Sequence, residues 1–455
     1  MSDRPNILFL FTDDQRFDTI AAVGNEQIHT PNLDRLCRRG TTFTNAYIMG
    51  GTSGAVCMPS RAMLHTGRTL FHIHREGHQI PEDHTLLGEH LRAHGYASFG
   101  TGKWHNGASS YARSFSDGGQ IFFGGMNDHW NVPACDFRAD GNYPEPRPYH
   151  ARFGHRHVGG DQSYDHVGRK HSTDLFIDET IDFLTNRRPG DRPFFAYTSF
   201  MAPHDPREMP AEFLNLYDPD QIELPANYLP EHPFDNGQLR IRDEMLAGFP
   251  RTEQEVRRHI AEYYAMISHI DASVGRALEA LEATGEAQNT IVIFAGDNGL
   301  AVGRHGLMGK QSVYDHSVHV PLIFAGPGIP AGERRDAFAY LLDIFPTLCD
   351  LTGLPTPESV EGSSLAGVIR GEQPCVREQM LLAYRHLHRG IQEQQYKLIE
   401  YNVDGTRITQ LFDLQADPME TGNLASDPLH QQTLARLRGD LARLRKACDD
   451  PHQWA

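Results

Sequence analysis

Runs of consecutive apolar residues alternate along the first two-thirds of the chain with segments in which apolar residues recur at helical spacing. Residues 6–11 are almost all apolar, which is typical of a central strand buried on both faces. Further strands are predicted over residues 96–100, 193–200 and 290–295. Strands that alternate with helices in this way predict a mostly parallel sheet covered by helices.

Helices are predicted between these strands, over residues 30–40, 85–95, 172–188 and 253–284. The apolar stripe of the last helix is interpreted as core and not as a cofactor site. The chain also contains two long segments with little periodicity.

These segments, residues 106–171 and 203–250, are rich in polar, glycine and aromatic residues. Long irregular segments inside a compact domain are usually functional loops. We therefore expect both of them to contribute to a binding or catalytic site.

The pattern changes beyond about residue 370 to short strands and turns that precede one closing helix. The predicted elements are strands at residues 380–384, 396–401 and 410–414 and a helix at 429–446. We expect an α/β fold in which a large, mostly parallel or mixed central sheet is sandwiched by helices. A catalytic domain would cover residues 1–370, and a C-terminal antiparallel-sheet subdomain with a terminal helix would cover residues 371–455.

Polar side chains follow four of the predicted strands at the point where each strand ends. These are Asp13 and Asp14, then Lys103 and His105, then His204, and finally Asp297 and Asn298. In open α/β sheets, ligands bind outside the carboxyl ends of the strands. The four groups therefore predict one shared site.

Asp13, Asp14 and Asp297 supply carboxylates to this site, and Asn298 supplies an amide oxygen. These are hard oxygen ligands, which suit Ca²⁺ or Mg²⁺ better than zinc. The alternative for each residue alone is turn chemistry, because Asp and Asn commonly form turns after strands. Two such sites at strand ends, together with the run that begins at Cys57, favour the metal.

Cys57 begins the run Cys-Met-Pro-Ser-Arg-Ala-Met-Leu-His-Thr-Gly-Arg. Pro59 suits the first position of a helix, and Gly67 suits the position just past its end. Cys57 is then expected at the start of a short helix, where free N–H groups and the helix dipole favour an anion. The alternative is that Cys57 is a small buried apolar residue, as most free cysteines are.

Together these motifs resemble the formylglycine-dependent (type I) sulfatase family of the alkaline phosphatase superfamily. That family has Asp-Asp after its first strand, Cys-x-Pro-Ser-Arg, Gly-Lys-x-His, a later His, Asp-Asn-Gly and a following Lys. The corresponding positions here are, in the same order, Asp13-Asp14, residues 57–61, residues 102–105, His204, residues 297–299 and Lys310. The resemblance extends over about residues 4–330 and has no departure at a position that the family uses for chemistry.

The resemblance implies that a separate maturation enzyme oxidises Cys57 to an aldehyde, formylglycine. In the family the hydrated aldehyde attacks sulfur and then collapses back to the aldehyde as it ejects sulfate, whereas a serine-like hydroxyl would be left as a stable sulfate ester. By the same resemblance, Arg61 holds the diol, and His105 deprotonates its second hydroxyl. His204 is expected to be the general acid for the leaving alcohol.

The resemblance also implies that Asp13, Asp14, Asp297, Asn298 and an oxygen of the modified Cys57 hold one divalent cation. We expect Ca²⁺, with Mg²⁺ or Mn²⁺ as alternatives. Asp297 would also take the proton of the attacking hydroxyl.

Lys103 and Lys310 are implied to neutralise charge on the sulfuryl oxygens. The residues alone leave two alternatives open. Both lysines could be solvated surface charges, and His105 and His204 could be ordinary loop histidines, since the chain has 26 histidines. Arg304 and His305 are interpreted as candidate substrate contacts.

The loop after residue 104 is predicted to decide which ester is bound. Its aromatic and hydrogen-bonding side chains suit a sugar ring, although the same residues would equally pack an ordinary loop. They are Trp104, Tyr111, Phe122, Phe123, Asp128, His129 and Trp130. The expected substrate is a carbohydrate O-sulfate of a mono- or oligosaccharide, with aryl sulfates as surrogates.

Two rival functions remain from the sequence. A phosphonate monoester or phosphodiester hydrolase of the same superfamily would tend to have Cys-x-Pro-Ala-Arg, whereas Ser60, Lys103, His105 and Asn298 here favour sulfate. A non-catalytic protein that binds sulfated glycans would be expected to have lost Cys57 or a metal ligand, and none is missing.

The formal net charge of −17 argues against nucleic acid or an anionic membrane as a partner, since each requires a basic surface. The six cysteines have neither paired nor zinc-like spacing, which suits a reducing compartment. The first strand is too short for a signal peptide or a membrane span, so a cytoplasmic location is expected, or a periplasmic or secreted one if a leader has been removed.

Overall fold

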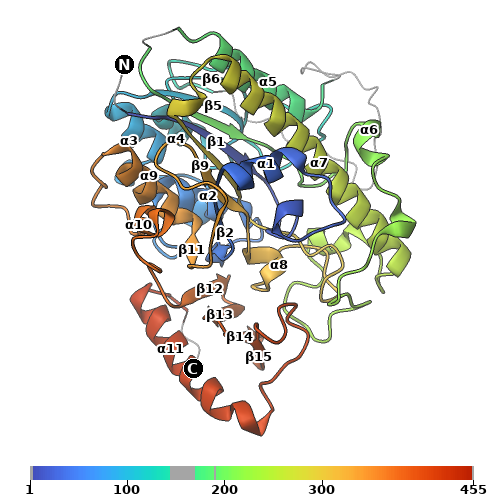
Figure 1. Cartoon of the computed structure of the whole chain (residues 1–455). Coiled ribbons are helices and arrows are strands. Elements are labelled where there is room, and N and C mark those ends of the chain that lie inside the picture. Colours follow the sequence, from blue (N-terminus) through green and yellow to red (C-terminus); the bar gives the residue numbers. More distant parts are fainter. Residues whose placement is uncertain (1–3, 144–169, 189–190, 453–455) are drawn as a thin grey trace.

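The structure is a computed structural model that describes residues 4–143, 170–188 and 191–452 (Figure 1). Its centre is a mixed sheet of eight strands in the order β10-β2-β9-β8-β1-β7-β5-β6. In that order the strands are Glu333–Arg335, Gly40–Phe43, Leu322–Ala325, Thr290–Gly296, Asn6–Thr12, Phe194–Ser199, Ala97–Lys103 and Asp117–Phe122. Only β9 runs antiparallel to its neighbours, β2 and β8.

The strand β1 lies at the middle of the sheet and pairs in parallel with β7 on one side and β8 on the other. Successive side chains of a strand point to opposite faces, so β1 contributes to two cores. Leu8 and Leu10 belong to the core under α5 and α7, and Ile7, Phe9 and Phe11 belong to the opposite core. This two-sided burial explains why the strand is apolar throughout.

Helices cover both faces of the sheet (Figure 1). The helices α1, α5 and α7 pack on one face, and α2, α3 and α9 pack on the other. The α-helices α1 to α11 are, in order, Pro31–Arg39, Cys57–Thr66, Leu87–Ala93, Ala108–Ser114, Ser172–Thr185, Ala211–Leu214, Glu253–Ala283, Asp315–Val318, Ile344–Thr352, Ala366–Arg370 and Gln431–Ala447.

A second sheet of five strands has the order β15-β14-β13-β12-β4. Its strands are, in that order, Thr406–Asp413, Tyr396–Val403, His388–Gln392, Met380–Tyr384 and Gly50–Gly51, and a two-stranded sheet pairs β3 (Ala46–Tyr47) with β11 (Ala339–Tyr340). The helix α11 lies along the small sheet at the lower end of the molecule in Figure 1.

The strand β4 joins the small sheet to the segment that leads into Cys57. Gly50 has a left-handed φ of 105°, and a Cβ there would lie 2.0 Å from the carbonyl oxygen of Ala383. Only glycine fits this approach. The small sheet is therefore tied directly to the chain that carries the predicted nucleophile, while the predicted boundary at residue 370 stays a prediction.

The predicted α/β fold with a large mixed sheet and a smaller antiparallel sheet is confirmed. Several element boundaries were wrong. The strand β5 continues to Lys103, and α5 ends at Thr185. The segment predicted to be irregular over residues 106–171 contains α4 and β6, and its residues 144–169 lie outside the described part of the chain.

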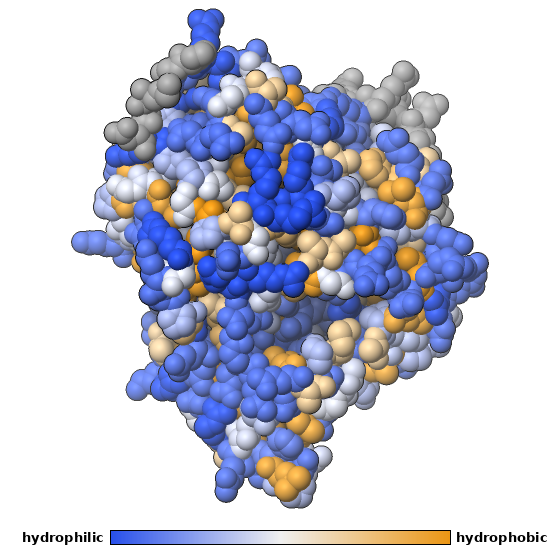
Figure 2. Space-filling model, in the orientation of Figure 1, coloured by the Kyte–Doolittle hydropathy of each residue, from blue (hydrophilic) through white to orange (hydrophobic). Residues whose placement is uncertain are grey.

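The face of the molecule seen in Figure 2 is mostly hydrophilic, with apolar residues in small scattered groups. Among the described residues, no helix combines the length and the apolar character needed to cross a bilayer.

Asp450 anchors the end of the chain to the small sheet. Its carboxylate accepts bonds of 2.7 and 2.8 Å from the buried guanidinium of Arg389 on β13, and of 2.6 Å from Arg445. Although burial opposes ionisation, hydrogen bonding and attraction from Arg389, joined by Arg445, lower the pKa of Asp450 to about 2 from 3.8. A depressed carboxylate pKa stabilises the folded state above the unfolded-state pKa.

We expect Asp450→Asn to lower the free energy of unfolding at neutral pH by about 2 kcal/mol. The difference in free energy of unfolding between this variant and wild type should have its full size at neutral pH. It should shrink as the pH falls from 3.8 towards about 2. Denaturant unfolding at several pH values measures it, with the exposed Asp182→Asn as control. Equal stability of Asp450→Asn and wild type at neutral pH would contradict the prediction.

Candidate active site

The strands that were predicted to end at one shared site are neighbours in the sheet, in the order β8-β1-β7-β5. Three of them are followed within a few residues by predicted site residues, and β5 ends on one, Lys103. Asp297 donates its backbone N–H to Thr12 O over 3.0 Å, which fixes the loop after β8 against the end of β1. The structure brings the predicted site residues together at the carboxyl edge of the sheet.

Cys57 is the first residue of α2, a helix in which every residue is buried. Gly67 ends this helix with a left-handed φ of 64°, as predicted. The prediction that Pro59 is the first helical residue was wrong, because the helix begins two residues earlier. Pro59 is still in the first turn, where its missing N–H costs no hydrogen bond.

The thiol of Cys57 lies among cationic and imidazole groups. Its Sγ is 3.4 Å from Nδ1 of His105 and 3.7 Å from Nζ of Lys103. Burial outweighs the attraction of these cations and raises the pKa of Cys57 to about 11, so the unmodified side chain is a thiol. Sγ stands at the position that an oxygen of a modified side chain would occupy.

Arg61 lies one turn after Cys57 in α2 and is completely buried. It donates 2.8 Å from Nε to Asp297 Oδ2 and 3.3 Å from Nη2 to Asp13 Oδ2. It also donates 2.6 Å from Nη1 to the hydroxyl of Ser199. Arg61 therefore links the end of β7 and the loops after β1 and β8 to the helix that carries Cys57.

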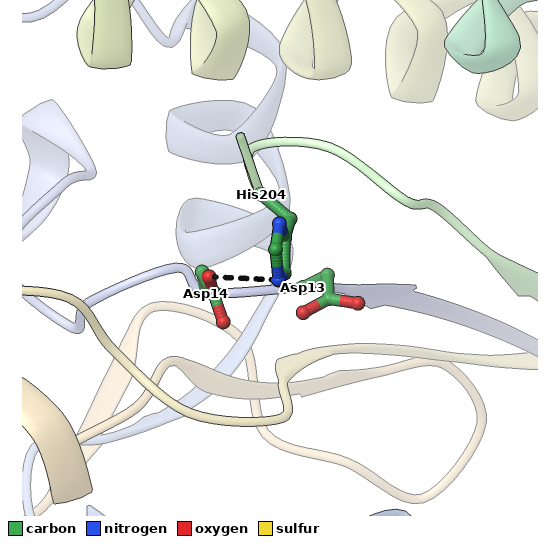
Figure 3. Close-up of side chains that lie close together, drawn as sticks. All are labelled: Asp13, Asp14 and His204. Carbon is green, nitrogen blue, oxygen red and sulfur yellow. Dashed lines mark ion pairs between the residues drawn. The ribbon is translucent and has the colours of Figure 1, made fainter. Parts of the chain in front are cut away.

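Two overlapping groups of side chains have the spacing of metal ligands. Ligand atoms of Asp13, Cys57 and Asp297 lie within 4.8 Å of one another, and so do those of Asp13, Asp14 and His204 (Figure 3). Asn298 joins them, since its Nδ2 donates 2.7 Å to Asp14 Oδ1. All of these side chains are buried.

Three oxygens in this cluster are buried without a hydrogen-bond partner: Oδ1 of Asp13, Oδ2 of Asp14 and Oδ1 of Asn298. Burial, followed by repulsion from Asp13, raises the pKa of Asp297 to about 7. Unpaired hard oxygens and crowded carboxylates are what a divalent cation relieves. The site therefore fits a divalent metal ion.

Lys103 and Lys310 are buried, which excludes the alternative that they are solvated surface charges. Lys103 forms an ion pair with Asp13, and Lys310 forms one of 2.5 Å with Asp14 Oδ1. Although burial opposes its charge, the attraction of Asp14 raises the pKa of Lys310. Both lysines are therefore ion-pair partners of the carboxylate cluster.

His204 and His105 both border the cluster, His204 next to Asp14 and His105 next to Cys57. His204 donates 2.8 Å from Nδ1 to the backbone carbonyl of Asp205, and its Nε2 points to Asp14 Oδ2 at 3.8 Å (Figure 3). Burial and the neighbouring lysines hold the pKa of each histidine well below its usual range. His105 and Asp14 also have left-handed backbones, with φ of 70° and 64°, a strained conformation that clusters at functional sites.

The prediction that the aromatic side chains after residue 104 suit a sugar ring was wrong for three of them, for which the alternative of internal packing holds. Trp104, Tyr111 and Phe122 are buried and pack in the hydrophobic cores, because Trp104 directly follows β5 and the other two belong to α4 and β6. Phe123 and Trp130 are partly exposed.

The proposed substrate contacts at residues 304 and 305 are occupied by other partners. Arg304 forms an ion pair with Asp18, and His305 stacks on Tyr314 with ring centroids 4.0 Å apart. Within the described part of the chain, neither forms a hydrogen bond or an ion pair with the carboxylate cluster.

One residue of the site, Ser199, was not identified from the sequence, and the bond that Ser60 makes was not predicted. Ser199 receives a bond from Arg61, and Ser60 donates 2.6 Å to the backbone carbonyl of Asp297. The signal for Ser199 was its place as the last residue of a strand that ends at the site. Ser60 was considered only as part of a motif.

Comparison with known proteins identifies the group to which this arrangement belongs. The family model "Sulfatase" matches residues 5–354, and the model "N-sulphoglucosamine sulphohydrolase, C-terminal" matches residues 303–447. An N-acetylglucosamine-6-O-sulfatase of Bacteroides thetaiotaomicron is 27% identical over 92% of this chain and 82% of its own length.

Two solved structures share the fold. A protein in complex with its substrate D-glucosamine-2-N,6-O-disulfate has a TM-score of 0.78 and 24% identity, over 98% of this chain and 99% of that one. The phosphonate monoester hydrolase of Agrobacterium radiobacter has a TM-score of 0.77 and 24% identity, over 98% and 96%.

Proposed function

The chain belongs to the sulfatase family and is an enzyme that hydrolyses sulfate esters, and we propose that Cys57, once oxidised to formylglycine, is its nucleophile. The observation that carries this proposal is the position of Sγ of Cys57, which lies beside Lys103, His105 and the carboxylate cluster. Hydration of the aldehyde would supply a nucleophilic hydroxyl there and a second hydroxyl whose loss of a proton releases sulfate. The overall reaction consumes one ester and one water and yields an alcohol and inorganic sulfate.

The side chains around Cys57 are placed for the proton and charge transfers that this reaction requires. Asp297 lies within reach of the attacking hydroxyl and accepts its proton. His105, whose Nδ1 is 3.4 Å from Sγ, accepts the proton of the second hydroxyl. Arg61 holds Asp297 in place and contributes positive charge beside the nucleophile.

Lys103, Lys310 and His204 act on the ester in this proposal. The two ammonium groups stabilise the charge that builds on the sulfuryl oxygens as the bond to the alcohol breaks. His204 gives a proton from Nε2 to the leaving oxygen in its imidazolium form, because Nδ1 already uses its hydrogen in the bond to the Asp205 carbonyl. That bond aims Nε2 towards Asp14 and the site, and the negative charge of a bound sulfate ester favours the imidazolium.

The divalent ion is proposed to be Ca²⁺, held by Asp13, Asp14, Asp297, Asn298 and the modified Cys57. The hard oxygens and their number favour Ca²⁺ over zinc. When bound, such a cation would polarise a sulfate oxygen and favour the ionised nucleophile.

The substrate is proposed to be a carbohydrate O-sulfate of a mono- or oligosaccharide. The support is the N-acetylglucosamine-6-O-sulfatase among the relatives, together with the partly exposed aromatic residues Phe123 and Trp130. A panel of defined sulfated saccharides, assayed for released sulfate, tests this proposal. Turnover of aryl sulfates without turnover of any saccharide would contradict it.

The alternative is a phosphonate monoester or phosphodiester hydrolase. Relatives of this kind share the fold, but Ser60 and Asn298 favour sulfate. We expect one matured preparation to hydrolyse an aryl sulfate with a higher kcat/KM than the matching aryl phosphonate monoester. A preference for the phosphonate on the same preparation would favour the alternative.

The mass of the peptide that contains Cys57 tests the nucleophile. We expect protein from the native host to carry an aldehyde in place of the CH₂SH group at residue 57. A thiol on every copy of that peptide would instead favour a protein that binds sulfated glycans without hydrolysing them.

A further inference from the structure

The segments that carry Lys310 and His204 lie outside helices and strands. His204 follows β7, and Lys310 lies between β8 and α8. A short 3₁₀ helix, η4 (Arg242–Leu246), contacts both segments. It belongs to the region that was predicted to be a functional loop, and the proposed reaction gives it no role.

Glu244 of η4 holds the backbone that leads into Lys310. Its buried carboxylate accepts one bond of 2.8 Å from the N–H of Met308 and another of 2.8 Å from the N–H of Gly309. Arg251 donates a further 2.8 Å to the same carboxylate. A charged carboxylate that accepts two successive N–H groups forms strong, directional bonds.

Asp243 of η4 holds the other side of Lys310. Its Oδ2 accepts 2.6 Å from Nε2 of Gln311, and Oε1 of Gln311 accepts 3.0 Å from the backbone N–H of Lys310. The backbone of Lys310 is thus fixed both before and after the residue.

Gly309 lets η4 approach this segment closely. A Cβ at this position would lie 2.3 Å from Oε1 of Gln311, 2.9 Å from Cβ of Asp243 and 3.0 Å from Oε1 of Glu244. The contact between η4 and residue 309 therefore requires glycine for steric reasons, in addition to the hydrogen bonds of the charged groups.

Arg242 connects η4 to the other segment. It donates 3.0 Å to Oδ1 of Asp205 and 2.7 Å to Oδ1 of Asp243. Asp205 is also the residue whose backbone carbonyl accepts the bond from Nδ1 of His204. One helical turn is therefore bonded to the neighbours of both His204 and Lys310.

We propose that η4 is a positioning element that sets the separation of Lys310 and His204, and thereby places the sulfuryl group between its charge stabiliser and its proton donor. This inference rests on the proposed roles of Lys310 and His204. Arg242, Asp243 and Glu244 act through these two residues as positioning residues. A misplacement of about 1 Å in such a pair costs roughly 10²-fold in rate.

Glu244→Gln tests the proposal because glutamine keeps the volume but accepts fewer bonds and has no charge. We expect kcat to fall roughly 10²-fold, with KM within a few-fold of wild type. Asp450→Asn is the matched control, since it removes a buried ion pair elsewhere. It should lower stability without lowering kcat.

Two further variants act on different parts of η4 and its contact. Gly309→Ala changes no charge and should lower kcat by a similar factor, while Gly439→Ala, where a Cβ meets no atom within 4 Å, should not. Arg242→Ala should make kcat depend more steeply on the pKa of the leaving alcohol in a series of aryl sulfates, because proton donation from His204 is impaired.

A measurement of sulfate binding, which needs no turnover, distinguishes failure of this inference from failure of the proposed function. In a Cys57→Ala background, sodium sulfate should raise Tm, and Glu244→Gln should weaken that effect because Lys310 is displaced. The inference is overturned if Glu244→Gln and Gly309→Ala leave both kcat and the sulfate-induced rise in Tm unchanged. Absence of sulfate ester turnover in the wild type would count against the proposed function, and the sulfate-binding comparison would still decide the role of η4.

Discussion

Cys57→Ala is expected to lower kcat for every sulfate ester by about 10⁴-fold or more, with the fold retained. When several catalytic residues act together, removing the nucleophile lowers kcat by several powers of ten. Cys57 is only 2% exposed, and its thiol makes only weak contacts with His105 and Lys103, so alanine leaves a small cavity and no strongly bonded partner unpaired. The loss is measured as released sulfate, with circular dichroism as the check on folding.

Cys57→Ser sharpens this test because serine keeps an oxygen but cannot become an aldehyde. Its hydroxyl can attack sulfur and release one alcohol, but the resulting sulfate ester has no second hydroxyl through which to collapse. We expect at most one equivalent of alcohol for each protein molecule, and then no further turnover. Cys349→Ala, at another buried cysteine in α9, is the control and should stay active. Sustained turnover by Cys57→Ser would contradict the proposed nucleophile.

Removal of the divalent cation is expected to abolish turnover and to lower Tm. Addition of Ca²⁺ should restore both, and Tm should rise with the Ca²⁺ concentration, because a ligand at 100 times its Kd stabilises the folded state by about 2.7 kcal/mol. The physical reason is the set of unpaired oxygens on Asp13, Asp14 and Asn298, together with the crowding that raises the pKa of Asp297.

Asp14→Asn should weaken Ca²⁺ affinity by about 10²-fold or more. At other metal sites, changing a residue that only hydrogen-bonds a ligand can already weaken metal affinity by about 10²-fold. Calorimetric titration with Ca²⁺ measures the affinity directly. Asp18→Asn is the control, because Asp18 lies in the same loop but pairs with Arg16 and Arg304. Equal Ca²⁺ affinities of Asp14→Asn and wild type would remove Asp14 from the ligand set.

That the site residues meet at one place could be predicted, because it depends only on recognising each strand from its own sequence. Each of the four strands could be recognised from its own apolar run, and parallel strands end at the same edge of a sheet. Asp13 follows β1 and Asp297 follows β8, so recognising the two strands was enough to bring these residues together. The start of α2 at Cys57 could likewise be predicted to within two residues from Pro59 and Gly67.

The aromatic residues after residue 104 show where this reasoning fails. Trp104 and Tyr111 were candidates for sugar contacts because aromatic faces beside hydrogen-bonding groups suit a sugar ring, with packing inside an ordinary loop as the equal alternative. In the folded chain they pack against each other, with ring centroids 5.7 Å apart, inside the core. Burial of a side chain depends on which distant elements cover it, and a short window of sequence does not contain that information.

The amino-acid sequence by itself determined the fold class, the family and the chemical groups that meet at the carboxyl edge of the sheet, since these depend on local periodicity and on motifs a few residues long. Only the tertiary structure decided that Lys103 and Lys310 are buried ion-pair partners, that Ser199 bonds Arg61, and that η4 joins the segments of His204 and Lys310. These contacts join residues that are mostly far apart in the chain. Their formation depends on how the loops pack over the sheet, which no local pattern specifies.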